Sequence, residues 1–420
     1  MKRRVLFVAE AVTLAHVTRA LALSRTLDPA AYEVCHAWDP RYNELIGEPP
    51  SPYVPIRTIP RARFAAALAR GTPIYQGPDL RRYVADDLAL IERFRPDVVV
   101  GDFRLSLDVS ARLAGVRYLT VTNGYWSPFA QVLPPVPDIT LTRLVGVRLA
   151  QRLFDHGQHA VSRWHGRAYR ELRRHHGLPP GPADVRYAYT RADTTLYADL
   201  PELVPVVDLP PEHHFVGPVT WSPDLPCPQW WDELPEDRPV VYVTLGSSGL
   251  APLLARVLSA LADLPVTVVA ATAGRPAPAR VPANARVAAM LPAARMLPRA
   301  VLAIGNGGSP SAYQALAAGV PVLGICDNLD QYLNMSLVER AGAGWLLRGG
   351  RASVTAIRDA VRRALSDEAA RVRAGSSRPP SISTTPRPAS APPSPEPPVS
   401  GSPVDGTARP PWRSRRAPRR

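Results

Sequence analysis

Cysteine, lysine and long hydrophobic runs are scarce in this sequence of 420 residues. The three cysteines, Cys35, Cys227 and Cys326, lack metal-ligand spacing, and their odd number does not make a disulfide framework. We therefore expect reduced thiols, a cytoplasmic protein and no bound metal. No run reaches the roughly 18 apolar residues that span a membrane, and Glu10 ends the first apolar run too early for a signal peptide.

The formal net charge of +14 lacks the distribution that is typical of a nucleic-acid-binding protein. Residues 376–420 contain eight Arg against Glu396 and Asp405, so +6 of this charge lies in that segment. The remainder is spread over an arginine-rich body without a basic stripe interleaved with aromatic residues. We therefore expect no nucleic-acid partner.

Residues 376–420 also differ from the rest of the chain in composition. Thirteen of these 45 residues are Pro, and large apolar side chains are almost missing. Such a segment cannot bury enough surface to offset the entropy of ordering it. The composition predicts a disordered C-terminal tail.

Elsewhere, apolar strands alternate with helix-like segments, which is typical of an α/β fold with a parallel sheet covered on both faces. The first series has strand-like runs at 4–9, 32–37, 96–103 and 116–122 and a helical pattern at 16–27. A Pro- and Trp-rich connector then precedes a second series. We predict two tandem, doubly wound, Rossmann-like domains that face each other across a cleft. Their predicted bounds are 1–218 and 240–375, with a linker at 219–239 and the tail at 376–420.

A glycine-rich turn follows the apolar run 301–304, in the segment GNGGSPSAYQALAAGVPVLGICDNLDQ (305–331). One interpretation is the dinucleotide fingerprint of an NAD(P)-dependent oxidoreductase, which would use residues 305–327 with Asp327 on a ribose hydroxyl. Against it, Pro310 stands where the third glycine is needed, and the turn lies late in its domain. A purely structural turn is another alternative.

The same turn suits a nucleotide sugar. Ser309 would cap the following helix with Pro310 at its first position, and the amides of Ser311 and Ala312 would face a diphosphate. Asp330 and Gln331 follow the next strand. A carboxylate accepts hydrogen bonds and an amide both accepts and donates them, so this pair fits sugar hydroxyls.

This stretch, continued to residue 344, resembles the donor-binding signature of UDP-glycosyltransferases, which are enzymes of the two-domain GT-B fold. The likeness extends over about residues 1–375 and includes VVYVTLGSS, FVGPV and PDVVVGDF. It implies transfer of a sugar from a UDP- or dTDP-linked donor to an acceptor hydroxyl. It also implies inversion at the sugar, no metal, and no cofactor besides the donor as co-substrate.

The resemblance further implies roles for single residues. His16, after the first strand, matches the acceptor base, and Asp102 matches the carboxylate that orients it. A neutral imidazole can take a hydroxyl proton while a carboxylate fixes its tautomer; alternatively, His16 only packs or caps the first helix. The positions that match donor-binding residues are Ser247, Ser248, Met290, Asn306, Gly307, Gly308, Ser309, Ser311, Asp330 and Gln331.

Three positions depart from the family pattern. Asn306 replaces a His beside the phosphates, Pro310 replaces a Gly, and Met290 stands where many relatives place a Trp that stacks on uracil. The donor base therefore stays open between uridine and thymidine. A catalytically silent nucleotide-sugar-binding protein is a further alternative.

The acceptor side gives weaker signals, and we expect a small apolar or lipid-like acceptor. Trp126 and Phe129 either line an apolar acceptor pocket or belong to the core. The basic helical stretch 141–176 either makes a peripheral membrane contact or is a solvated face. Relatives end with a helix that crosses back onto the first domain, whereas residues 354–375 run into the tail, so we expect weak domain closure.

Overall fold

The structure is a computed structural model that describes residues 1–49, 52–246 and 251–376. The predicted tail, apart from Ser376, lies outside these residues, and so do Ser247 and Ser248. No helix within the described ranges is long and apolar enough to cross a membrane.

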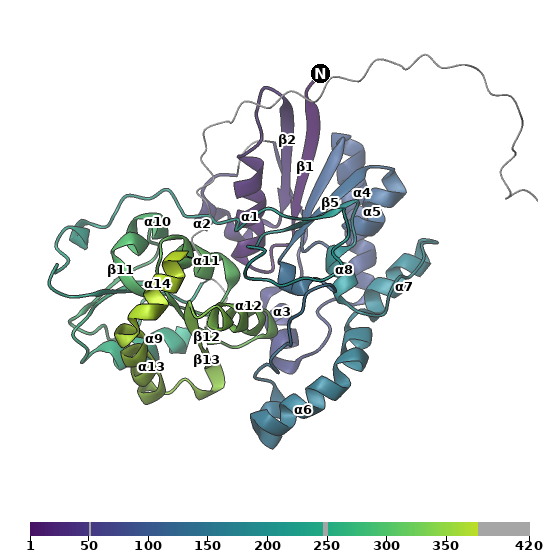
Figure 1. Cartoon of the computed structure of the whole chain (residues 1–420). Helices are drawn as coiled ribbons and strands as arrows, with labels where there is room; N and C mark the ends of the chain where they lie inside the picture. Colours follow the sequence, from purple (N-terminus) through teal and green to yellow (C-terminus); the bar gives the residue numbers. More distant parts are fainter. Residues whose placement is uncertain (50–51, 247–250, 377–420) are drawn as a thin grey trace, which may run out of the picture. The chain divides into compact units, whose positions relative to one another are not determined.

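The first sheet is parallel and has seven strands in the order β3-β2-β1-β4-β5-β6-β7 (Figure 1). The strands are β1 (Arg3–Ala9), β2 (Tyr32–Trp38), β3 (Tyr53–Pro55), β4 (Val98–Asp102), β5 (Arg117–Thr122), β6 (Thr194–Tyr197) and β7 (His213–Phe215). The strand order reverses between β1 and β4, and ligands of such sheets bind beyond the strand ends at this point. His16 follows β1, and Asp102 is the last residue of β4.

Eight α-helices accompany the first sheet within the described residues. They are α1 (Leu14–Ser24), α2 (Asn43–Ile46), α3 (Arg61–Arg70), α4 (Gly77–Phe94), α5 (Leu107–Ala114), α6 (Thr140–His165), α7 (Arg167–His175) and α8 (Arg186–Thr190). Helix α1 packs against β1 and β4, while α4 packs against α5 and α7. The basic helical stretch predicted at 141–176 corresponds to α6 and α7.

The second sheet is parallel and has six strands in the order β10-β9-β8-β11-β12-β13. The strands are β8 (Val240–Thr244), β9 (Thr267–Ala271), β10 (Ala285–Ala288), β11 (Ala300–Gly305), β12 (Val322–Cys326) and β13 (Gly344–Arg348). The helices are α9 (Ala251–Leu261), α10 (Ala293–Met296), α11 (Ser309–Ala317), α12 (Leu329–Arg340), α13 (Val354–Ser366) and α14 (Glu368–Ser376). The predicted fold class, an α/β protein with two parallel sheets, is confirmed.

The second sheet buries a hydrophobic cluster on each face. Helices α9 and α13 supply one cluster, which includes Val257 and Val361. The other contains Tyr313 of α11 and Tyr332 of α12, together with Tyr125 and Val204 from the first half of the chain. The two sheet domains therefore share buried apolar contacts on the side of α11 and α12.

Candidate active site and donor-binding turn

His16 and Asp102 lie at the carboxyl ends of adjacent strands. Asp102 is the last residue of β4 and pairs with Ala9 at the end of β1, and His16 lies in the first turn of α1. The structure brings their side chains together, with His16 Nδ1 2.7 Å from Asp102 Oδ1. When Nδ1–H donates to this carboxylate, Nε2 carries the lone pair that can take a proton. The Asp102 side chain is 2% exposed and that of His16 is 16% exposed.

Arg19 is a second partner of Asp102 that the sequence interpretation missed. Its Nε donates to Asp102 Oδ2 at 2.6 Å and its Nη2 donates to Oδ1 at 2.7 Å, which makes a bidentate pair. Burial disfavours the charged form of Asp102, but the charge of Arg19 and hydrogen bonds from His16 and Arg19 lower the pKa of this carboxyl overall. Asp102 is therefore held ionised beside the imidazole. The signal for Arg19 in the sequence was its three-residue spacing from His16 on α1, which puts both side chains on one helix face.

A chain of side-chain hydrogen bonds continues from Arg19 to the second domain. Arg19 Nη1 donates to Asn123 Oδ1 at 2.8 Å, and Asn123 Nδ2 donates to Asp199 Oδ1 at 2.9 Å. Tyr313 of α11 also donates to Asp199, at 2.5 Å. Burial raises the pKa of Asp199, against the effect of the donors around it. The His16 site is thus joined by polar contacts to the helix that follows the glycine turn.

An aromatic stack adjoins the imidazole. The His16 ring stacks on Phe103 with centroids 4.7 Å apart, and Phe103 stacks on Tyr189 at 5.1 Å. Phe103 has a φ of 59°, a left-handed conformation that is unusual for a bulky residue and marks local strain. Trp126 packs against Tyr189 with centroids 5.4 Å apart. The base candidate therefore faces an apolar, aromatic surface.

The glycine turn between β11 and α11 is tightly packed. Gly307 has a φ of 82°, and a Cβ at this position would lie 2.6 Å from Cys326 Sγ and 2.8 Å from Met335 Cγ. Asn334 Nδ2 donates to the Gly307 carbonyl at 2.9 Å, and Asn306 Oδ1 accepts from the Gly308 amide at 3.2 Å. These contacts fix the backbone that leads into the helix N-terminus.

The predicted cap of this helix is wrong by one residue. Gly308 is the N-cap, with extended backbone and a carbonyl that accepts the first helical bond from the Ala312 amide at 3.1 Å. Ser309 is already helical and buried, and Pro310 occupies the second helical position. The Ser311 hydroxyl donates to the Gly308 carbonyl at 3.2 Å. Glycine is among the residues that helix N-caps favour.

Asp330 and Gln331 both lie in the first turn of α12 but meet different partners. Asp330 Oδ1 accepts from the Tyr125 hydroxyl at 3.0 Å and from Trp126 Nε1 at 2.8 Å. Gln331 is buried, and its side-chain oxygen accepts from the Asp327 amide at 2.8 Å. Asp330 therefore contacts the first domain, whereas the Gln331 oxygen supports the loop before α12.

Asp138 connects the two domains through a set of contacts that the sequence interpretation did not find. Arg348 donates to Asp138 Oδ1 from Nη2 at 2.6 Å and from Nε at 3.0 Å. The Tyr332 hydroxyl and the Gly350 amide both donate to Asp138 Oδ2 at 2.9 Å. Since these donors lie about 200 residues from Asp138 along the chain, no local sequence pattern marks the group.

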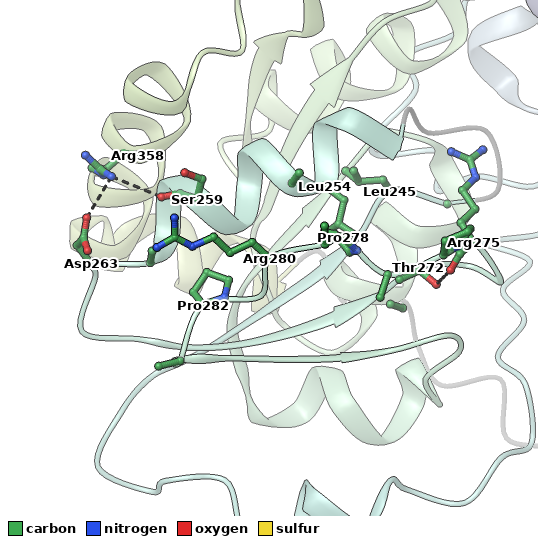
Figure 2. A pocket seen from close by; sticks show the side chains of 18 residues that line it. Leu245, Leu254, Ser259, Asp263, Thr272, Arg275, Pro278, Arg280, Pro282 and Arg358 are labelled. Carbon is green, nitrogen blue, oxygen red and sulfur yellow. Dashed lines mark hydrogen bonds and ion pairs between the residues drawn. The ribbon is translucent and has the colours of Figure 1, made fainter.

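A cavity of about 900 Å³ lies in the second domain, between α9 and the loop 272–283 (Figure 2). Figure 2 shows Arg358 paired with Asp263 at one end, where the distance is 3.4 Å, and Thr272 and Arg275 at the other. Among the described residues, none of the predicted donor-binding positions lines this cavity. Met290 follows β10 and is half-buried.

Within the described ranges, no group of three or more His, Cys, Asp or Glu side chains is arranged to hold a metal ion. The predicted metal independence of the reaction stays a prediction.

Known proteins resemble this chain at several levels. Residues 255–392 match the family model of the erythromycin biosynthesis protein CIII-like C-terminal domain. The PGL/p-HBAD biosynthesis glycosyltransferase of Mycobacterium tuberculosis (strain ATCC 25177 / H37Ra) is 50% identical over 365 residues, covering 87% of this chain and 85% of that protein. The PGL/p-HBAD biosynthesis rhamnosyltransferase of Mycobacterium bovis (strain BCG / Pasteur 1173P2) is also 50% identical, covering 87% and 81%.

Among solved structures, spinosyn rhamnosyltransferase SpnG complexed with thymidine diphosphate has a TM-score of 0.62 at 22% identity, with 90% of this chain and 95% of that chain covered. Its fold and that of this chain are GT-B, the two-sheet architecture of sugar-transferring enzymes. The chain belongs to the UDP-glycosyltransferase family and is a glycosyltransferase. These relatives do not favour the oxidoreductase alternative.

Proposed function

We propose that the protein transfers a sugar from a nucleotide diphosphate sugar to a hydroxyl of a small apolar or lipid-like acceptor, with His16 as the base. The observation that carries this proposal is the His16–Asp102 contact beside the stacked rings of Phe103 and Tyr189. A base that faces aromatic surface suits an acceptor whose hydroxyl sits on an apolar body.

The proposed reaction has one displacement step. His16 Nε2 takes the proton of the acceptor hydroxyl as its oxygen bonds to the anomeric carbon of the sugar. The bond from that carbon to the donor diphosphate breaks with both electrons, and the nucleotide diphosphate leaves. Asp102 keeps the His16 tautomer and stabilises the imidazolium that forms. The N-terminus of α11 would stabilise the charge of the leaving diphosphate.

For the donor, we put a dTDP-linked sugar first and a UDP-linked sugar second. A fold relative binds thymidine diphosphate and a sequence relative is named as a rhamnosyltransferase, so rhamnose is the first sugar to test. Asp330 would accept hydrogen bonds from sugar hydroxyls, in exchange for those it now receives from Tyr125 and Trp126. Ser247 and Ser248 are proposed phosphate contacts that lie outside the described residues.

Equilibrium binding to the purified protein tests the donor proposal. We expect dTDP or UDP to bind and NAD not to bind. If Asp330 holds the sugar, Asp330→Ala should weaken nucleotide-sugar binding by roughly ten- to a hundredfold, since hydrogen bonds to a charged group contribute about 1.5–3 kcal/mol. Binding of the bare nucleotide diphosphate should hardly change.

Asp263→Ala is the matched control, since this exposed carboxylate lies beside α9 and pairs only weakly with Arg358. Asp263→Ala should leave the affinity for the nucleotide sugar and that for the nucleotide diphosphate unchanged. Equal losses for nucleotide and nucleotide sugar in Asp330→Ala would instead make Asp330 a structural residue.

A further inference from the structure

Helix α6 (Thr140–His165) projects from the first domain (Figure 1), and most of its residues are exposed. Of its 26 residues only Thr142 and Ala150 are buried. Its exposed side chains nevertheless include large apolar ones: Leu144 is 77% exposed, Leu149 48%, Leu153 49% and Trp164 48%. A surface helix normally turns such residues toward the core, and a contiguous exposed apolar patch marks an interaction site.

Four exposed apolar residues fall on one face of the helix; of the others, Leu144 and Val145 precede the kink at Gly146, and Val161 lies about a quarter turn away. Gly146 has a non-helical backbone, so the regular helix runs on from Val147. Leu149, Leu153, Ala160 and Trp164 are spaced by four, seven and four residues, which places them in one stripe. Arg148, Arg152 and Arg163 directly precede Leu149, Leu153 and Trp164, so they flank the stripe on one side.

We propose that this face of α6 docks onto an anionic lipid membrane, with the stripe in the interface and the flanking arginines on lipid phosphates. Helix α6 contains four Arg against the single acid Asp155. An amphipathic helix with Leu and Trp on one face and Arg beside it is the form that lies in the plane of such an interface.

The charge pattern disfavours a second copy of the chain as the occupant. In a symmetric dimer the same patch meets itself. The exposed side chains of Arg148, Arg152 and Arg163 would then share an interface with the same arginines of the second copy, with Asp155 as the one acid on the helix to offset them. Like charges brought together at an interface oppose association, whereas anionic lipids neutralise them.

The C-terminal end of α6 leads toward the acceptor side of the site. The Nε2 atom of His165, its last residue, lies 3.2 Å from the Gly71 carbonyl oxygen. His165, Tyr75 and Tyr189 line a void of about 20 Å³, which is too small for an acceptor but places the end of α6 beside Tyr189. Tyr189 belongs to the aromatic stack beside His16. A lipid-borne acceptor would therefore approach along this helix. That link rests on the proposed function; the docking surface itself does not.

Flotation of the full chain with liposomes tests the docking surface. Vesicles of phosphatidylcholine with about 30% phosphatidylglycerol should carry the protein, and vesicles of phosphatidylcholine alone should not. The triple variant Leu149→Ser, Leu153→Ser, Trp164→Ser should partition roughly tenfold or more weakly. Residues 376–420 carry eight Arg and attract anionic lipid by charge alone, but every variant retains them.

The matched control removes three exposed apolar side chains elsewhere, Leu133, Val207 and Val281, each replaced by Ser. Its vesicle binding should equal that of the wild type. If the first triple variant unfolds in a thermal melt, Arg148→Glu, Arg152→Glu, Arg163→Glu replaces it, with the same expected loss. Equal vesicle binding by a folded α6 variant and the wild type would overturn the proposal. So would a wild-type dimer that the α6 variant dissociates without any vesicle binding.

Transfer to a detergent-dispersed acceptor separates this proposal from the proposed function. The α6 variants should keep that activity while losing vesicle binding. Absence of transfer in the wild type would contradict the proposed function and leave the vesicle result standing.

Discussion

Asp102 contacts two side chains, His16 and Arg19, and each contact has a different effect on the site. Contact with His16 provides the orientation that a general base needs. The bidentate contact with Arg19 supplies most of the charge compensation that a buried carboxylate requires. Arg19 is thus a positioning residue that acts on His16 through Asp102.

Replacing Arg19 by Met should destabilise the fold by about 3–5 kcal/mol at neutral pH, because Asp102 would remain buried with its charge poorly compensated. The pKa of Asp102 is lowered in the folded chain, so its ionisation stabilises the fold above its unfolded pKa of about 4. This contribution is lost as the pH falls through the lower pKa that Asp102 has in the folded chain. In Arg19→Met the buried carboxylate lacks this compensating charge, so we expect its pKa to rise and the carboxyl to take up a proton as the pH approaches 4. The deficit of Arg19→Met should therefore be larger at pH 7 than at about pH 4, as measured by urea denaturation.

Arg167→Met is the control, since Arg167 forms an exposed pair with Glu171 one helical turn away. This variant should unfold at nearly the wild-type urea concentration at both pH values. A deficit of Arg19→Met that stays constant with pH would show that Arg19 stabilises the fold by packing alone.

The family resemblance assigned His16 and Asp102 from the sequence. Both lie at or just after strand ends, which meet at one edge of a parallel sheet. Their contact is present in the structure, while their catalytic roles stay predictions. Arg19 was overlooked because its three-residue spacing from His16 is a weak signal in an arginine-rich chain.

The turn into α11 is the element on which the donor proposal depends. Gly307 combines a positive φ with side-chain neighbours from β12 and α12, so it holds the start of the helix close to both. The backbone amides at the start of a helix can bind a diphosphate only if the preceding turn keeps this backbone conformation.

Gly307→Ala should therefore lower the free energy of unfolding by about 2–4 kcal/mol, through backbone strain and overlap with Cys326 and Met335. It should also weaken binding of the nucleotide diphosphate, measured by calorimetry on the folded fraction. Gly157→Ala in α6 is the matched control, because a Cβ there meets nothing within 4 Å. That change should raise stability by roughly 0.5–1 kcal/mol. A Gly307→Ala protein as stable as Gly157→Ala would refute the packing argument.

Element type could be predicted from the sequence where burial is uniform. The strands β1, β4, β8 and β9 are continuous apolar runs, so their periodicity and length sufficed. Helix boundaries were less certain: α11 starts at Ser309 rather than after it, and the kink at Gly146 in α6 had no clear signal. Both depend on local backbone geometry that apolar spacing does not encode.

Across the whole molecule, polar side chains join the two sheet domains at several places, three of which are prominent among the described residues. These are Asp138 with Arg348 and Tyr332, Asp199 with Tyr313, and Asp330 with Tyr125 and Trp126. Sequence reasoning could not find them, because the partners are more than 100 residues apart. The expectation of weak domain closure stays untested.

Asp138→Ala should loosen the contact between the domains, because Arg348 would lose its carboxylate partner while remaining partly buried. We expect a loss of about 3 kcal/mol in stability and faster cleavage of the connector 219–239 by a protease. Nucleotide binding, which is proposed for the second domain alone, should be almost unchanged. Asp359→Ala, at an exposed pair with Arg362, is the control and should leave cleavage unchanged. Unaltered cleavage in Asp138→Ala would show that the remaining contacts suffice.

The central claim is that His16 acts as the general base in sugar transfer by this molecule. The most direct measurement is product formation, followed by mass spectrometry, with dTDP-rhamnose or a UDP-sugar and an apolar hydroxyl-bearing acceptor. The wild type should form glycosylated acceptor, and His16→Ala should lower the rate by about 10²–10⁴-fold at nearly unchanged donor affinity. Asp102→Asn should give a smaller loss of the same kind. A folded His16→Ala protein that transfers sugar at the wild-type rate would contradict the account.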